Sequence, residues 1–358
     1  MIEDNLYYSK KLTTNYPMIS SYPFHANLLS IISNTDEYLS WFYNYYIQLE
    51  IPPIGHWLGT RLDFYTPLLW KSCPWIYYQR ISRDLLAKKW KSICEFIIDS
   101  IDLGYYAYFN IDRFYISEYD SSHKEHRVHD IFVFGYNLKN KTFNIADNFR
   151  DNKYYYANAS FDEIMESYLN VDDNWLFGVE LIKFRKKGEY KFDISIVKDF
   201  LVDFLESKNT KERYRLPSEQ VAISEGMKNA YINNSNLHAG GWKFGRDIYN
   251  VLREYIGLID NKNNDVDLRS FHVLKEHKVV MLGRLKYLYD NQYISNIERI
   301  YSNYEDVKEW TIILLNLMIK YSICGNENIL ERATKLLYDI EMVEYNVLSE
   351  VLNQIIKG

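Results

Sequence analysis

The sequence changes character near residue 215, and this change limits the architectures open to the chain. Before that point, short β-rich runs alternate with segments of helical periodicity. After it, apolar residues recur at helical spacing almost throughout. We therefore expect an α+β domain over residues 1–214 and a helical domain or extension over residues 215–358. The helical patterns of the second part cover residues 244–259, 270–289, 294–319 and 329–356.

A central β-strand is predicted at residues 131–136, where the run Ile-Phe-Val-Phe-Gly-Tyr is apolar on both faces. A turn rich in Asn and Lys joins this strand to a second strand at residues 142–145. Ser160 and Glu163 form a capping-box pattern that predicts a helix ending at Leu169. Three further strands and one further helix are expected from the same kinds of pattern: strands at residues 105–111, 114–116 and 175–184, and a helix at residues 194–205.

A long helix with one break is predicted from Pro74 to Gly104. Proline favours the first position of a helix, and apolar residues recur at helical spacing between Tyr77 and Ile97. This prediction matters for function because it places Cys73 directly before the helix.

Composition and charge exclude several classes of protein. Of the 358 residues, 47% are apolar and 25% are charged, a balance that excludes collagen-like and wholly disordered chains. A net charge of -6 argues against a nucleic-acid partner. The apolar stretch at residues 310–319 is about half of the roughly 20 residues that a membrane span requires. With three cysteines and no signal-peptide pattern, the chain is expected to be soluble and cytoplasmic.

Each cysteine is interpreted from its surroundings. Cys94 lies on the apolar face of its predicted helix, and Cys324 lies at the end of a helix, so both are interpreted as structural. Cys73 would lie at the N-terminus of the predicted helix, where free N–H groups and the helix dipole favour a thiolate. Cys73 is therefore the candidate nucleophile.

A thiolate nucleophile needs a base and a group that orients the base. His129 stands at the entrance of the central strand, and Asp147 follows the paired strand, so the hairpin is expected to bring them together. The order Cys73, His129, Asp147 matches the Cys-His-Asp arrangement of papain-like folds. His126 and Asp130 remain the alternatives for base and orienting group.

Structural interpretations stand beside these functional ones. Cys73 is also explained as a small buried residue at a helix start, His129 as a buried histidine with satisfied hydrogen bonds, and Asp147 as a turn residue. A metal site formed by His123, His126 and His129 is a further alternative, although residues at this spacing in a strand would not share one face.

The segments Cys73–Trp75 and His129–Tyr136, together with Asp147, resemble papain-like cysteine-protease homologues of secondary-metabolite assembly. This family includes the butirosin-type acyltransferases and amide synthetases of the closthioamide type. The segment Phe271–Lys278, followed by Met281 and Arg284, is also similar to the family. The resemblance covers residues 60–290, and it implies a papain-like fold with no resident cofactor and no metal.

The resemblance also implies a reaction. Cys73 would attack a thioester on the phosphopantetheine arm of an acyl or peptidyl carrier protein, and the acyl group would then pass to a small amine. His129 would move the protons and Asp147 would hold the imidazole, giving amide-bond formation as in nonribosomal peptide and antibiotic biosynthesis. The chain departs from the butirosin type at its N-terminus, where that group has its nucleophile and this chain has Ser20, Ser21 and His25.

Two other functions remain open. The same triad would serve a cysteine peptidase or thioesterase, in which water replaces the amine. A non-catalytic binding protein of the same fold would need no reactive thiol. For the acyltransferase, a basic face on the predicted helix is expected to dock the acidic carrier protein, and its residues are Arg80, Arg83, Lys88, Lys89 and Lys91.

Overall fold

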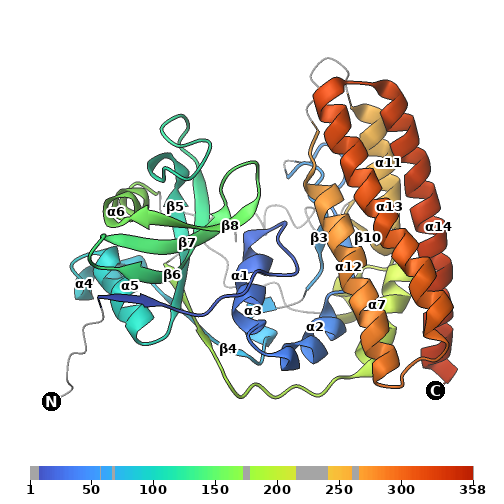
Figure 1. Ribbon diagram of the computed structural model, residues 1–358, viewed down its shortest axis with the longest axis horizontal. Coiled ribbons are helices and arrows are strands. Elements are labelled where there is room, and N and C mark those ends of the chain that lie inside the picture. The colour runs from blue at the N-terminus through green and yellow to red at the C-terminus, as the bar shows by residue number, and fades with distance from the viewer. Residues whose placement is uncertain are drawn as a thin grey trace. The chain divides into compact units, whose positions relative to one another are not determined.

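A computed structural model gives the structure of the chain and describes residues 8–56, 58–66, 69–171, 178–214, 241–259 and 266–357. These residues divide into two compact units (Figure 1). The first unit contains residues 8–38 and 69–190, and the second contains residues 39–66, 191–214 and 241–357, each within the described ranges.

The first unit is built on a seven-stranded antiparallel sheet with the order β4-β9-β5-β6-β7-β8, in which β1 also pairs with β6. Its strands are β1 (Ser9–Lys11), β4 (Ile76–Ile81), β5 (Tyr106–Asp112), β6 (Val128–Asn137), β7 (Thr142–Asn148), β8 (Tyr154–Ser160) and β9 (Val179–Phe184). The predicted central strand is confirmed as β6, and its predicted partner as β7. The predicted strand at residues 105–111 is β5, and the one at residues 175–184 is β9, with residues 175–177 outside the described range.

Helices cover both faces of this sheet (Figure 1). The helices and 3-10 turns of the unit are α1 (Pro23–Ile32), η1 (Asp36–Tyr38), α3 (Leu69–Ser72), α4 (Arg83–Lys89), α5 (Ile93–Asp102), η2 (Arg113–Tyr115) and α6 (Phe161–Leu169). Helices α5 and α6 pack with alternate residues of β6 and β7, such as Ile131 and Ile145, in one buried core. Helix α1 packs against the opposite face, where Asn27 accepts a hydrogen bond from the hydroxyl of Tyr154 at 2.8 Å.

The capping box at α6 is confirmed. The side chain of Ser160 accepts a hydrogen bond from the backbone N–H of Glu163, and the Glu163 carboxylate accepts one from the backbone N–H of Ser160. These two bonds satisfy N–H groups that the first turn of a helix leaves without a partner.

Two predictions for this unit are wrong. Residues 114–116 do not form a strand, because the carboxylate of Asp112 accepts a hydrogen bond from the N–H of Phe114 and caps the 3-10 turn η2 instead. The long helix from Pro74 to Gly104 is also wrong over its first part, where residues 76–81 form the edge strand β4 and helices begin only at α4 and α5.

The second unit is mainly helical. Its elements are α2 (Leu39–Tyr45), β2 (Leu49–Ile51), β3 (Asp63–Phe64), α7 (Ile194–Leu205), α8 (Thr210–Tyr214), β10 (Lys243–Phe244), η4 (Gly245–Asp247), α11 (Ile248–Leu258), α12 (Arg269–Asp290), α13 (Ile297–Cys324) and α14 (Glu327–Lys357). The predicted helix at residues 194–205 and the four predicted helices after residue 240 are confirmed. No helix among the described residues combines the length and the apolar character needed to cross a bilayer.

The division into units differs from the predicted boundary at residue 214. Strand β2, from the N-terminal part of the chain, pairs with β10, so that Ile51 lies opposite Lys243. The guanidinium of Arg284 on α12 donates to the carbonyl oxygens of Tyr43 and Tyr46 at 2.8 and 2.6 Å. These non-local contacts bind residues 39–66 to the helical unit.

A buried polar cluster joins four helices of this unit, α11, α12, α13 and α14, and includes part of segment 271–278. Lys278 on α12 lies 2.7 Å from Glu344 on α14, and it also donates to Nδ1 of His277 at 3.0 Å. The hydroxyls of Tyr249 and Tyr304 each donate to the Glu344 carboxylate at 2.6 Å. Every charge in the cluster therefore has a partner, as burial requires.

Candidate functional site

The structure brings His129 and Asp147 together at one end of the sheet. The antiparallel pairing of β6 with β7 places their side chains side by side, and Nδ1 of His129 lies 2.9 Å from Oδ2 of Asp147. The His129 side chain is 24% exposed, whereas the Asp147 side chain is fully buried. The predicted proximity of the two residues is confirmed, and their catalytic role stays a prediction.

The charges around this pair favour its ionised form. Burial lowers the pKa of His129, but the negative charges of Asp147 and Asp130 outweigh this effect and leave the pKa above its ordinary value of 6.5. Burial raises the pKa of Asp147, but His129 and Arg113 outweigh burial and hold it below the ordinary value of 3.8. With Nδ1 directed at Asp147, the other ring nitrogen, Nε2, is the one that can exchange a proton with a substrate.

Two further residues contact Asp147, and sequence reasoning missed both. The hydroxyl of Tyr119 donates to Oδ2 of Asp147, and Nη2 of Arg113 lies 3.8 Å from the same oxygen. Both residues come from the segment between β5 and β6. No motif marks them, because only the path of that segment brings it to the end of β7.

The position predicted for Cys73 is wrong. Cys73 follows the short helix α3 and precedes β4, so it does not lie at the start of a helix. Its side chain is buried, and burial raises the pKa of the thiol to about 12, although a hydrogen bond from the backbone of Trp75 opposes this effect. The thiolate that nucleophilic attack requires is therefore disfavoured.

The strand register also separates Cys73 from His129. Through the pairing of β4, β9, β5 and β6, Arg80 lies level with Phe132. From this level, β4 runs back to Ile76 in one direction, whereas His129 lies in the other direction. The two displacements, four residues and three residues, add to a separation of about 23 Å along the strands. Because Cys73 precedes Ile76, it lies at the end of the sheet opposite to His129.

The alternative residues have partners of their own. Nδ1 of His126 lies 2.6 Å from Oδ2 of Asp112, and the His126 side chain is 62% exposed. Asp130 remains beside His129, because its Oδ1 lies 3.5 Å and its backbone oxygen 2.9 Å from Nδ1 of that residue. Among the described residues, no cluster of His, Cys, Asp or Glu is arranged to hold a metal ion.

The predicted basic face does not lie on one helix. Arg80 is on β4 and forms an ion pair with Glu180. Arg83 donates to the backbone oxygens of Tyr168 and Asn110 at 3.0 and 3.3 Å. Only the three lysines of the face are exposed: Lys88, Lys89 and Lys91.

The start of α1 reaches the strand end that carries Asp147. The side-chain amide of Asn148 donates to the backbone oxygen of Ser21 at 3.1 Å. Because side chains alternate along β7, Asn148 and Asp147 point to opposite faces of the sheet. The segment that holds the nucleophile in the butirosin type therefore contacts the residue after Asp147 from the opposite face of the sheet, and in this chain the segment contains no cysteine.

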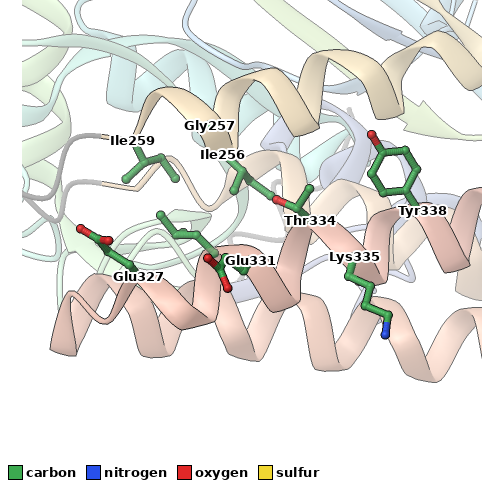
Figure 2. A pocket seen from close by; sticks show the side chains of 9 residues that line it. Ile256, Gly257, Ile259, Glu327, Glu331, Thr334, Lys335 and Tyr338 are labelled. Carbon is green, nitrogen blue, oxygen red and sulfur yellow. The ribbon is translucent and has the colours of Figure 1, made fainter.

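A separate concave surface belongs to the helical unit. A groove of about 600 Å³ lies between α11 and the beginning of α14, as Figure 2 shows. Ile256 and Ile259 line one side, and Glu327, Glu331 and Lys335 line the other. None of the predicted site residues lines this groove.

Comparisons with known proteins identify no family for this chain. No family model matches it, and no curated protein matches it significantly.

Proposed function

We propose that the chain is a papain-like acyltransferase that forms amides, with His129 as general base and Asp147 as the residue that orients it. The observation that carries the proposal is the 2.9 Å contact between Nδ1 of His129 and Oδ2 of Asp147. The resemblance of residues 129–136 and Asp147 to the butirosin-type family supports acyl transfer as the reaction.

The reaction in this proposal is direct transfer without an acyl-enzyme on Cys73. The amine nitrogen attacks the carbonyl carbon of a thioester on the phosphopantetheine arm of a carrier protein, and Nε2 of His129 accepts the proton that the nitrogen loses. The tetrahedral intermediate then expels the sulfur of the arm, and the imidazolium returns the proton to that sulfur. The products are an amide and a free thiol, so no ATP or cofactor is needed. Asp147 stabilises the imidazolium between the two steps.

The decisive experiment uses an acyl thioester of N-acetylcysteamine with a panel of primary amines, with amide formation measured by mass spectrometry. We expect His129→Gln to lower the rate about 100- to 10,000-fold. His126→Gln is the matched control, because His126 also pairs with an aspartate but at a separate site. Absence of amide with every amine would refute the acyltransferase, and free acid as the sole product would identify a thioesterase or peptidase instead.

Intact-protein mass spectrometry tests the direct route. We expect no stable acyl adduct after exposure to the thioester. An adduct that disappears in Cys73→Ala would restore the covalent mechanism, and an adduct that disappears in Ser21→Ala would assign the nucleophile to the start of α1.

Carrier-protein docking is proposed at the exposed lysines of α4 and the turn after it. Exchange of Lys88 and Lys89 for glutamate should raise the KM for a carrier-bound donor and leave the KM for the N-acetylcysteamine donor unchanged. Arg80→Glu is unsuitable for this test, because it would place a second carboxylate against Glu180. Equal KM values for the variant and the wild type would remove the docking face from the proposal.

The second candidate is a non-catalytic binding protein of the same fold. The raised pKa of the Cys73 thiol and the absence of a cysteine at the start of α1 favour it. In that case the chain would bind a thioester or an amine without converting it, and His129→Gln would leave the affinity for the ligand unchanged.

A further inference from the structure

The Asp147 carboxylate is held unevenly by its surroundings. One oxygen, Oδ2, lies 2.9 Å from Nδ1 of His129 and 3.8 Å from Nη2 of Arg113. The same oxygen accepts a hydrogen bond from the hydroxyl of Tyr119. The other oxygen, Oδ1, is buried and has no hydrogen-bond partner among the described residues. The contacts therefore converge on the oxygen that faces the histidine.

Tyr119 links the members of this cluster. Its ring meets the imidazole of His129 edge-on, with the ring centres 6.3 Å apart and the planes at 68°. The guanidinium of Arg113 lies over the same ring, 4.5 Å from its centre. Tyr119 is almost fully buried, so water does not replace its hydroxyl at Asp147.

Donors that share one carboxylate oxygen compete for its negative charge. A hydrogen bond from Tyr119 and the positive charge of Arg113 both stabilise the ionised carboxylate, and both reduce what it contributes to a proton on His129. We infer that Tyr119 and Arg113 are positioning residues that fix Asp147 and limit how tightly His129 holds its proton. The catalytic meaning of this inference rests on the proposed function, since a base must release the proton again to complete transfer.

The charges that face His129 come from three neighbouring parts of the first unit. Asp130 lies on the same strand, Asp147 lies on β7, and Arg113 comes from the segment after β5. The two carboxylates raise the pKa of His129, whereas Arg113 lowers it. Tyr108 contributes indirectly, because its hydroxyl donates to Asp130.

The test is an NMR titration of the His129 imidazole in the full-length protein. The signal is assigned by its loss in His129→Gln, which is necessary because the chain has 8 histidines. Tyr119→Phe keeps the ring and removes the hydroxyl. We expect the variant to bind the proton on His129 about three- to ten-fold more tightly, which raises the pKa of that residue. Arg113→Gln should also raise the pKa of His129.

Tyr155→Phe is the matched control. Tyr155 lies opposite Asp147 in the register of β7 and β8, but its hydroxyl donates to Glu118 at 3.3 Å. This variant should titrate like the wild type at His129. An unchanged His129 titration in both Tyr119→Phe and Arg113→Gln would overturn the inference and leave Tyr119 a packing residue.

The titration needs no turnover, so it separates this inference from the proposed function. A shifted titration in a protein that forms no amide would support the positioning role and refute the acyltransferase. Amide formation with an unshifted titration would support the acyltransferase and refute the positioning role. If the titration is shifted and amide is also formed, the acid limb of the plot of kcat/KM against pH should move to higher pH in Tyr119→Phe. The size of this move should equal the change in the pKa of His129.

Discussion

The buried ion pair of the helical unit gives the most direct test of the structure. Lys278 and Glu344 lie 2.7 Å apart, and their side chains are 0% and 1% exposed. We consider the variant Lys278→Met, which keeps most of the aliphatic stem and removes the ammonium group. The Glu344 carboxylate then remains buried without a counter-charge, although two tyrosine hydroxyls still donate to it.

The expected loss in the free energy of unfolding depends on which buried groups each variant leaves without a partner. Breaking a buried pair by removal of one partner destabilises a protein by about 3–5 kcal/mol. Lys278→Met and Glu344→Leu should each fall in that range, so simple addition would give about 6–10 kcal/mol. The double variant has no unpaired charge, but it leaves the hydroxyls of Tyr249 and Tyr304 without their acceptor and Nδ1 of His277 without its donor. At about 1–3 kcal/mol for each of these three groups, its loss should be about 3–9 kcal/mol and smaller than the measured sum of the two single losses.

The assay is urea unfolding of the full chain, with hydrogen exchange of the α12 amides used to assign the transition of the helical unit. Lys286→Met is the control on the same helix, because Lys286 pairs with Asp290 at 2.9 Å but the two side chains are 63% and 48% exposed. The control should lose no more than about 0.5 kcal/mol. If Lys278→Met were as stable as Lys286→Met, or if the double variant lost the full sum, the structure of this cluster would be refuted.

Three other outcomes are expected, each measurable by unfolding experiments. The His129–Asp147 pair stabilises the fold fully only between the ordinary pKa values of 3.8 and 6.5, declining as pH rises through the raised pKa of the histidine and as pH falls through the lowered pKa of the aspartate. His129→Ala should therefore destabilise the protein more at about pH 5.5 than at about pH 8.5, and equal losses would contradict the ion pair. Ser160→Ala should lose about 1 kcal/mol because it removes half of the α6 capping box, and Glu163→Gln should lose less. Gly135→Ala should lose about 1–3 kcal/mol, because the new Cβ would lie 2.8 Å from a backbone oxygen of β1; a neutral result would show that the bulge in β6 relaxes freely.

Local signals account for most of what the sequence predicts correctly. The apolar run of β6, the polar turn after it and the capping box of α6 each depend on residues that lie within a few positions of one another. The His129–Asp147 contact belongs to this class, because a single hairpin brings the two residues together. Helices α7 and α11 to α14 were likewise predictable from apolar periodicity alone.

The errors arise where distant segments decide the structure. The run Ile76–Ile81 fits helical spacing, but it forms a strand because it pairs along its whole length with β9, about a hundred residues later. No signal near Cys73 reports that pairing. The same reason explains why residues 39–66 join the helical unit, since β2 pairs with β10 and Arg284 holds the carbonyl oxygens of Tyr43 and Tyr46.

The position of Cys73 changes what the proposed base must do. In direct transfer His129 has no thiol proton to remove, and its whole task is to accept the proton that the amine loses. The amine must arrive without its own extra proton, as it also must when it attacks an acyl-enzyme. Alkyl amines resemble lysine, with a pKa near 10.4, so only about one molecule in 2,500 is neutral at pH 7. Asp147 and Asp130 beside His129 would favour the ammonium form further, because they place negative charge near the site. In the proposed reaction, a site of this charge therefore suits weakly basic amines, such as arylamines, which are neutral at pH 7 and would still lose a proton to His129 once the C–N bond had formed.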